Sequence, residues 1–168
     1  MIPILFIGFA ALLVGCSLMV ILNRNPVTSA LWLVLGFVSL AGLYLLLQAE
    51  FLAMVQIIVY AGAIMVLFLF VLMLLGVEQQ EVLQETIKGQ RPAAVLLTLG
   101  LLVAIVAALA AGVFDAEPSS LAAANEGGNV QAVGRLLFTH YTFAFETAGV
   151  LLVVAAVGAL VLGKRQAP

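Results

Sequence analysis

The chain has 168 residues, of which 65% are hydrophobic and only 8% are charged, with a net charge of −2. Soluble domains carry roughly a quarter charged residues, so a water-soluble fold of this length is excluded. Continuous apolar blocks argue against a transmembrane β-barrel, which requires alternating positions, and the absence of a basic, aromatic patch argues against a nucleic-acid partner. We predict an all-α integral membrane protein that contacts the lipid bilayer.

Charged residues divide the chain into five apolar blocks, and each has about the 20 residues that a membrane-spanning helix needs. The blocks are residues 2–22, 27–47, 51–75, 93–114 and 141–162. We predict five transmembrane helices in a single membrane domain covering residues 1–168, with a further short interfacial helix over residues 130–138. The blocks show no internal repeat, so the inverted-repeat plan of many transporters has no support in the sequence.

The basic residues predict the orientation of the chain, because cytoplasmic loops are enriched in Lys and Arg. Five spans place the two termini on opposite sides of the membrane, and Arg135 then lies on the side of the N-terminus. The other five basic residues lie on the side of the C-terminus: Arg24, Lys88, Arg91, Lys164 and Arg165. We therefore predict a periplasmic N-terminus and a cytoplasmic C-terminus.

The first block contains the only cysteine, Cys16, so an internal disulfide and a multi-cysteine metal site are excluded. The LVGC segment (residues 13–16) resembles a lipoprotein cleavage box. No Lys or Arg precedes Arg24, however, whereas a secretory signal begins with a positively charged region. We expect Cys16 to be a small apolar thiol inside a retained first helix.

The third block combines polar and small residues in a way that a simple membrane anchor does not need. Gln56 and Tyr60 are four residues apart, so they share one helix face, which must meet protein or a polar cavity. Ala61, Gly62 and Ala63 form a narrow segment just beyond them, where another backbone can approach closely. Gly62 also weakens the helix, which favours a twist or a π-bulge. A plain packing face explains the same spacing.

Other polar residues are weaker candidates. Glu146 lies inside the fifth block, and ionisable residues in spans are functional hypotheses by default, although its position near the end of the block also allows it to reach water. Glu50 begins the third block, where we expect a solvated helix end. His140 is the only histidine, and we expect a structural role at the interface because a metal site would need partners.

Small residues in the second and fifth blocks indicate faces that pack closely against other helices. They are Ser29, Gly36, Ser39, Gly42, Ala148, Gly149, Ala155, Ala156, Gly158 and Ala159. The chain therefore has the pattern of a subunit within a larger membrane assembly.

The third block also carries a family resemblance. FLAMVQIIVYAGAIMVLFLFVLMLL (residues 51–75) closely resembles the signature helix of the J subunit of proton-pumping NADH:quinone oxidoreductase, respiratory complex I. Mitochondria encode a counterpart as the sixth subunit of their NADH dehydrogenase. Residues 24–51 and 134–160 are similar to the second helix region and the last helix of this family, so the resemblance spans nearly the whole chain.

The resemblance implies a switchable third helix. In this family the helix carries a π-bulge, which corresponds here to Tyr60, Ala61, Gly62 and Ala63. Its change between bulged and regular forms is associated with making or breaking a hydrated proton path. By this resemblance Gly62 is the hinge.

Four other residues complete the site that the resemblance implies. Gln56 and Tyr60 would order water or polar groups, and Met65 and Phe68 would gate hydration by their bulk. Glu146 is a candidate intramembrane acid that would buffer or orient the outer end of the path.

The resemblance also implies the setting of the chain. It would be a non-catalytic subunit of the translocase in a bacterial inner membrane. Quinone, FMN and iron–sulfur clusters would be bound by other subunits. Its partners would be the quinone-site H subunit, the small A and K subunits, and the antiporter-like N subunit. Two alternatives stay open, a small secondary transporter and a purely structural membrane subunit.

Overall fold

The computed structural model describes residues 1–76, 90–112 and 127–164. Lys88 and Arg165, which contributed to the predicted orientation, and the last two residues of the predicted fourth span (113–114) lie outside these ranges. The chain divides into two units, Met1–Ser120 and Leu121–Pro168, and each is described by itself.

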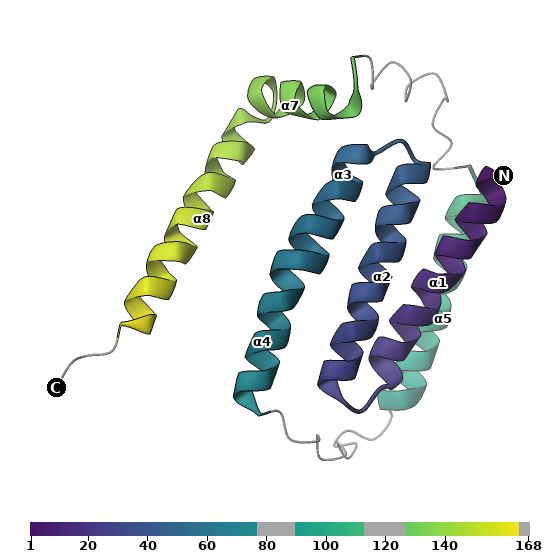
Figure 1. Ribbon diagram of the computed structural model, residues 1–168. Helices are drawn as coiled ribbons and strands as arrows, with labels where there is room; N and C mark the ends of the chain where they lie inside the picture. Colours follow the sequence, from purple (N-terminus) through teal and green to yellow (C-terminus); the bar gives the residue numbers. More distant parts are fainter. Residues whose placement is uncertain (77–89, 113–126, 165–168) are drawn as a thin grey trace. The chain divides into compact units, whose positions relative to one another are not determined.

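The described part of the chain is helical, as predicted, and contains five helical spans long and apolar enough to cross a membrane. Four are single helices and the third is built from three consecutive segments (Figure 1). The spans are α1 (Ile2–Leu22), α2 (Pro26–Leu46), α3 with η1 and α4 (Glu50–Leu75), α5 (Gln90–Ala110) and α8 (Thr142–Gly163).

Helices α2 and α5 end one and four residues earlier than the predicted spans, because left-handed residues follow the helices. The second span was predicted to end at residue 47, but α2 ends at Leu46, and Gln48 beyond it has a φ of 57°. The fourth span was predicted to reach residue 114, but α5 ends at Ala110, and Gly112 has a φ of 66°. A residue in this conformation cannot continue a right-handed helix.

The first unit has α1 and α2 packed as an antiparallel pair. The loop Asn23–Asn25 joins them, and the Asn25 side chain accepts hydrogen bonds from the backbone N–H groups of Val27 (2.9 Å) and Thr28 (3.4 Å). This cap satisfies N–H groups that the first helical turn leaves unpaired. Pro26 at the first helical position lacks an N–H group and therefore needs no partner.

Small residues allow the two helices to approach closely. The Ser39 hydroxyl donates a 2.7 Å hydrogen bond across the interface to the backbone oxygen of Phe9. Cys16 lies within α1 and is buried, and a Cβ atom added to Gly36 would lie 3.5 Å from its Cβ atom. The α1–α2 pair is thus held by backbone proximity and by a hydrogen bond between the helices.

This proximity predicts a disulfide between the helices. We expect Gly36→Cys to pair with the native Cys16 on mild oxidation, because disulfides join Cβ atoms about 3.5–4.5 Å apart. Mass spectrometry of the non-reduced and reduced peptides will measure the yield. The matched control is Gly8→Cys, about two helical turns from Cys16 on α1, because a Cβ atom there meets nothing within 4 Å. A lack of pairing at position 36 would contradict the described α1–α2 contact.

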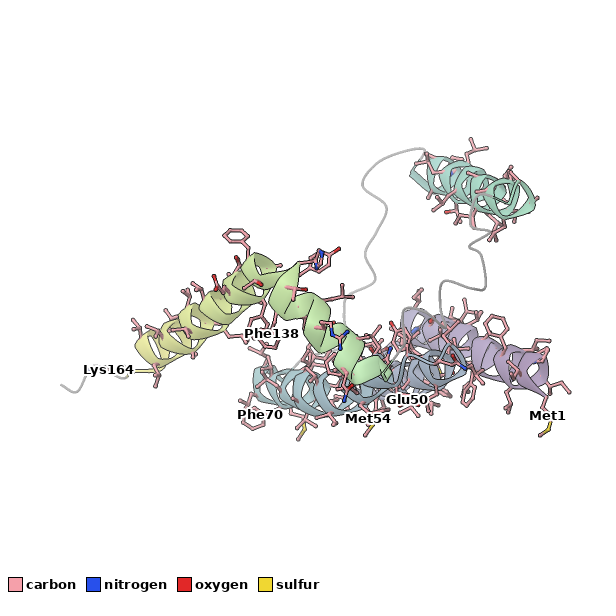
Figure 2. All side chains as sticks on the ribbon, turned by 90° about the horizontal axis from the view of Figure 1, so that it is seen from above. Met1, Glu50, Met54, Phe70, Phe138 and Lys164 are labelled. Carbon is pink, nitrogen blue, oxygen red and sulfur yellow. The ribbon has the colours of Figure 1, made fainter. Side chains whose placement is uncertain are left out.

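The other face of α2 carries the third span. Helix α2 contacts α3 (Glu50–Val55), η1 (Gln56–Ile64) and α4 (Met65–Leu75), and it lies between α1 and this span (Figure 1). Met54 and Phe70 project outward from the third span in the view of Figure 2, and both are exposed. The third span therefore presents one face to α2, and Met54 and Phe70 lie away from that contact.

The second unit contains α7 (Asn129–Thr139) and α8. The short helix predicted over residues 130–138 is present as α7, an amphipathic helix. The rings of Phe138 and Phe145 pack edge to face with centroids 5.0 Å apart. The backbone N–H groups of His140 and Tyr141 both donate to the Leu136 oxygen at 3.0 Å. These contacts fix the corner at which α7 leads into α8.

Candidate functional site

The middle of the third span is a π-helix, η1, which covers Gln56–Ile64. In this form the backbone N–H bonds to the carbonyl oxygen five residues earlier rather than four. The Met65 N–H at its end donates both to the Tyr60 oxygen, five residues back, and to the Gly62 oxygen. Pi-helical segments are rare in proteins, and those that occur are often found at functional sites. We therefore take η1 as the candidate functional site of the described residues.

The π-helix is longer than the segment that the family resemblance indicated. It includes Tyr60, Ala61, Gly62 and Ala63, but it begins four residues earlier, at Gln56. It has nine residues, so it is more than one isolated bulge within an α-helix.

Two side chains at the ends of η1 are buried. Gln56 is 5% exposed and Met65, the first residue of α4, is 3% exposed, and Ala53 on α3 is buried as well. Because α2 contacts all three segments, these residues define the face of the third span that meets α2. An amide buried in this position needs a polar partner or a water molecule, since an unpaired buried polar group costs about 1–3 kcal/mol.

Tyr60 and Phe68 lie differently from Gln56 and Met65. The Tyr60 ring packs edge to face against Phe37 of α2, with centroids 5.9 Å apart and planes at 68°. Even so, Tyr60 remains 45% exposed, and Phe68 is 46% exposed. The predicted polar face is therefore divided in this structure, with the amide of Gln56 against α2 and Tyr60 at the edge of that contact.

Gly62 lies at a crowded point of the π-helix. A Cβ atom added there would lie 3.3 Å from the backbone oxygen of Ile57, the residue five positions earlier. Gly62 and Ala61 are half-buried, whereas Ala63 is exposed. Glycine at position 62 thus lets the wide turn form without pressing a side chain against the carbonyl oxygen of Ile57.

The remaining candidates lie outside this site. Glu146 is exposed on α8, in the second unit. Glu50 is the first residue of α3, where a carboxylate favours the positive end of the helix dipole. The Nδ1 atom of His140 lies 2.9 Å from the Thr139 hydroxyl oxygen. In the described parts of the chain, no group of three or more His, Cys, Asp or Glu residues is placed to hold a metal ion.

Phe37, the aromatic partner of Tyr60, was not among the site residues predicted from the sequence. Phe37 follows Gly36 in α2, so the same segment contacts α1 through its glycine and η1 through its aromatic ring. The presence of small residues in the second block was the available signal, and it marked the segment without identifying the aromatic contact.

Comparisons with known proteins give one consistent result. The family model described as NADH-ubiquinone/plastoquinone oxidoreductase chain 6 matches residues 16–162. NADH-quinone oxidoreductase subunit J of Rhodobacter capsulatus is 41% identical, over 95% of this chain and 80% of the relative. The subunit J of Rickettsia bellii is 36% identical (98% and 81%), and NADH-quinone oxidoreductase subunit 10 of Thermus thermophilus is 42% identical (90% and 83%).

Proposed function

Because this chain belongs to the family of NADH-ubiquinone/plastoquinone oxidoreductase chain 6, the subunit J family of complex I, we propose that it helps couple quinone reduction to proton translocation through a switchable third helix. Membership makes the chain a complex I subunit, and its five apolar spans make it a multi-pass membrane protein. The observation that supports the coupling role is the nine-residue π-helix, which begins at the buried Gln56.

The geometry of a π-helix explains how such a switch acts. Conversion of η1 to an α-helix moves each backbone hydrogen bond by one residue. One residue of an α-helix corresponds to a rotation of about 100°, since 3.6 residues make a turn. Conversion therefore turns α4 relative to α3 by an angle of that order. Met65 would leave the α2 interface, and the exposed Phe68 would move around the helix.

The residues of η1 and α4 have distinct roles in this proposal. Gly62 is the hinge, and the small side chains of Ala61 and Ala63 leave space for the change. Gln56 and Tyr60 order water or neighbouring polar groups. Their hydrogen-bonding groups suit a hydrated path because they replace part of the solvation that the bilayer removes.

The bulky residues beyond the hinge complete the proposal. Met65 and Phe68 act as the hydrophobic gate, because their rotation opens or closes the space beside α2. Glu146 orients the outer end of the path.

The chain also has a proposed position among the other subunits of the enzyme. The H, A, K and N subunits of the complex are its proposed neighbours, in a bacterial inner membrane with the N-terminus outside. Quinone, FMN and the iron–sulfur clusters are bound by other subunits. This chain transfers no electrons and acts only through its conformation.

A reversible cross-link tests the switch. In a Cys16→Ser background, Phe37→Cys and Tyr60→Cys are joined in the assembled complex by a short thiol-reactive linker that reduction removes. We expect linking to lower both NADH:quinone electron transfer and proton translocation, by about tenfold for each 1.4 kcal/mol added to the barrier. The link lowers the rates because it holds η1 against α2. After reduction, both rates should return to those of the same variant before linking.

The disulfide between Gly36→Cys and Cys16 is the matched control, since it joins the α1–α2 pair and leaves η1 free. We expect that disulfide to leave both rates unchanged. Undiminished turnover in the complex linked at positions 37 and 60 would contradict the switch. It would favour the alternative that this chain is a purely structural subunit.

A further inference from the structure

A cavity of about 160 Å³ lies between α1 and α2, and Phe37, the aromatic partner of Tyr60, is among its lining residues. Leu13, Cys16 and Val20 line it from α1, and Trp32, Gly36 and Leu40 line it from α2. We call this cavity the α1–α2 groove. The helices are antiparallel, so Val20 and Trp32 lie at its end nearer the connecting loop, and Leu13 and Leu40 lie at the other end.

The size and lining of the groove favour a flexible apolar ligand. A dry cavity of about 150 Å³ holds a molecule the size of benzene, whereas a helix is about 10–12 Å wide and does not fit. The Ser17 hydroxyl, also in the lining, donates to the Leu13 oxygen at 2.8 Å and so is already paired. The groove therefore suits part of a hydrocarbon chain.

The position of the groove along the helices matches one leaflet of a bilayer. From Leu13 to Val20 is seven residues, or about 10 Å of helix. Leu13 is nine residues before Leu22, the last residue of α1, which is about 14 Å, close to half of a roughly 30 Å hydrocarbon core. The groove thus runs from near the loop toward the middle of the span, along the course of a single acyl chain.

The loop end of the groove carries a positive charge. Arg24 is the only charged side chain between Met1 and Ala49, and it lies in the connecting loop, two residues after α1 ends at Leu22. Arg24 is exposed, so its guanidinium group is accessible to a phosphate oxygen, with which it forms charge-assisted hydrogen bonds. Trp32 lies at the same end, and tryptophan is enriched at the level of lipid headgroups.

We propose that the α1–α2 groove is a binding site for an anionic phospholipid, with part of one acyl chain in the groove and the phosphate on Arg24. The hydrocarbon lining selects the acyl chain, and the single cation selects the headgroup. The groove adjoins the proposed switch of η1 at Phe37, but its test measures lipid binding and not turnover.

Photo-cross-linking of the assembled complex tests the site. The complex is placed in nanodiscs containing phosphatidylglycerol with a diazirine at the middle of one acyl chain, and a parallel sample contains the same chain on phosphatidylcholine. We expect phosphatidylglycerol adducts on groove residues within 13–20 and 32–40. Phosphatidylcholine should label them about fivefold less, because a basic residue near the surface contributes that order of preference.

Four variants separate the two parts of the proposal. Ser17→Phe should remove the adducts by filling the groove, whereas the matched control Val14→Phe, on an exposed part of α1 outside the groove, should keep them. Arg24→Gln should reduce phosphatidylglycerol labelling to the phosphatidylcholine level, and Arg24→Lys should preserve most of the difference.

Equal labelling by the two lipids, or adducts spread evenly around both helices, would overturn the proposal. A groove left unlabelled because a side chain of a neighbouring subunit fills it would overturn it as well. The comparison of the two lipids uses the unmodified chain, so the test remains decisive if Ser17→Phe prevents assembly.

Discussion

Gly62→Val is expected to lower both NADH:quinone electron transfer and proton translocation in an assembled complex. A Cβ atom at this position lies 3.3 Å from the Ile57 oxygen, so valine presses against a carbonyl of the π-helix itself. Its branched Cβ also restricts rotation about the first side-chain bond, which stiffens the segment. A barrier raised by about 1.4 kcal/mol would slow turnover about tenfold. Both activities are measured side by side in membrane vesicles after assembly has been checked.

Two companion variants separate loss of the hinge from crowding. Gly62→Ala adds the Cβ atom without the branch, so we expect a smaller loss than with valine. Gly15→Val places the same branched side chain on α1, where its Cβ atom meets nothing within 4 Å, and should leave both activities unchanged. Normal rates and normal proton yield in assembled Gly62→Val would leave η1 as an ordinary packing segment.

The five membrane-spanning helices could be predicted because few backbone structures are stable within a lipid bilayer. Every backbone polar group in lipid must be paired, so long apolar blocks become helices. The exact ends were less predictable because they depend on single left-handed residues. After α2, the Ala49 N–H bonds to the Tyr44 oxygen and the Gln48 N–H bonds to the Leu45 oxygen, which is a Schellman cap with glutamine where glycine is usual. Composition gave no sign of that cap.

The candidate site was predictable only in part. Gly62, Gln56 and Tyr60 led to the prediction of a weak point in the third span, and all three lie in η1. The extent of the π-helix was not evident, because the residues from Gln56 to Val59 also suit an α-helix. The different burial of Gln56 and Tyr60 depends on the wider turn and on contact with α2. A periodicity based on 3.6 residues per turn places both on one face and therefore misses this difference.

Gly42→Leu is expected to reduce assembly of the complex, because Gly42 lies against the Phe9 ring. A Cβ atom added there would lie 2.7 Å from the Cε1 and Cζ atoms of that ring, so α1 must move or the ring must leave its position. The backbone oxygen of Phe9 also accepts the hydrogen bond from Ser39, three residues before Gly42, so displacement of α1 strains that bond as well. Overpacking of this kind costs about 1–3 kcal/mol.

A second substitution that restores the space shows whether the contact with Phe9 is the cause. We expect Phe9→Ala to recover much of the assembly lost in Gly42→Leu, because it removes the ring that the leucine strikes. Gly8→Leu is the matched control, since its Cβ atom meets nothing within 4 Å. Native gels measure the assembled fraction of each variant. If the double variant assembles no better than Gly42→Leu alone, the defect arises outside the α1–α2 pair. Displacement of α1 from α2 would then not explain the loss of assembly.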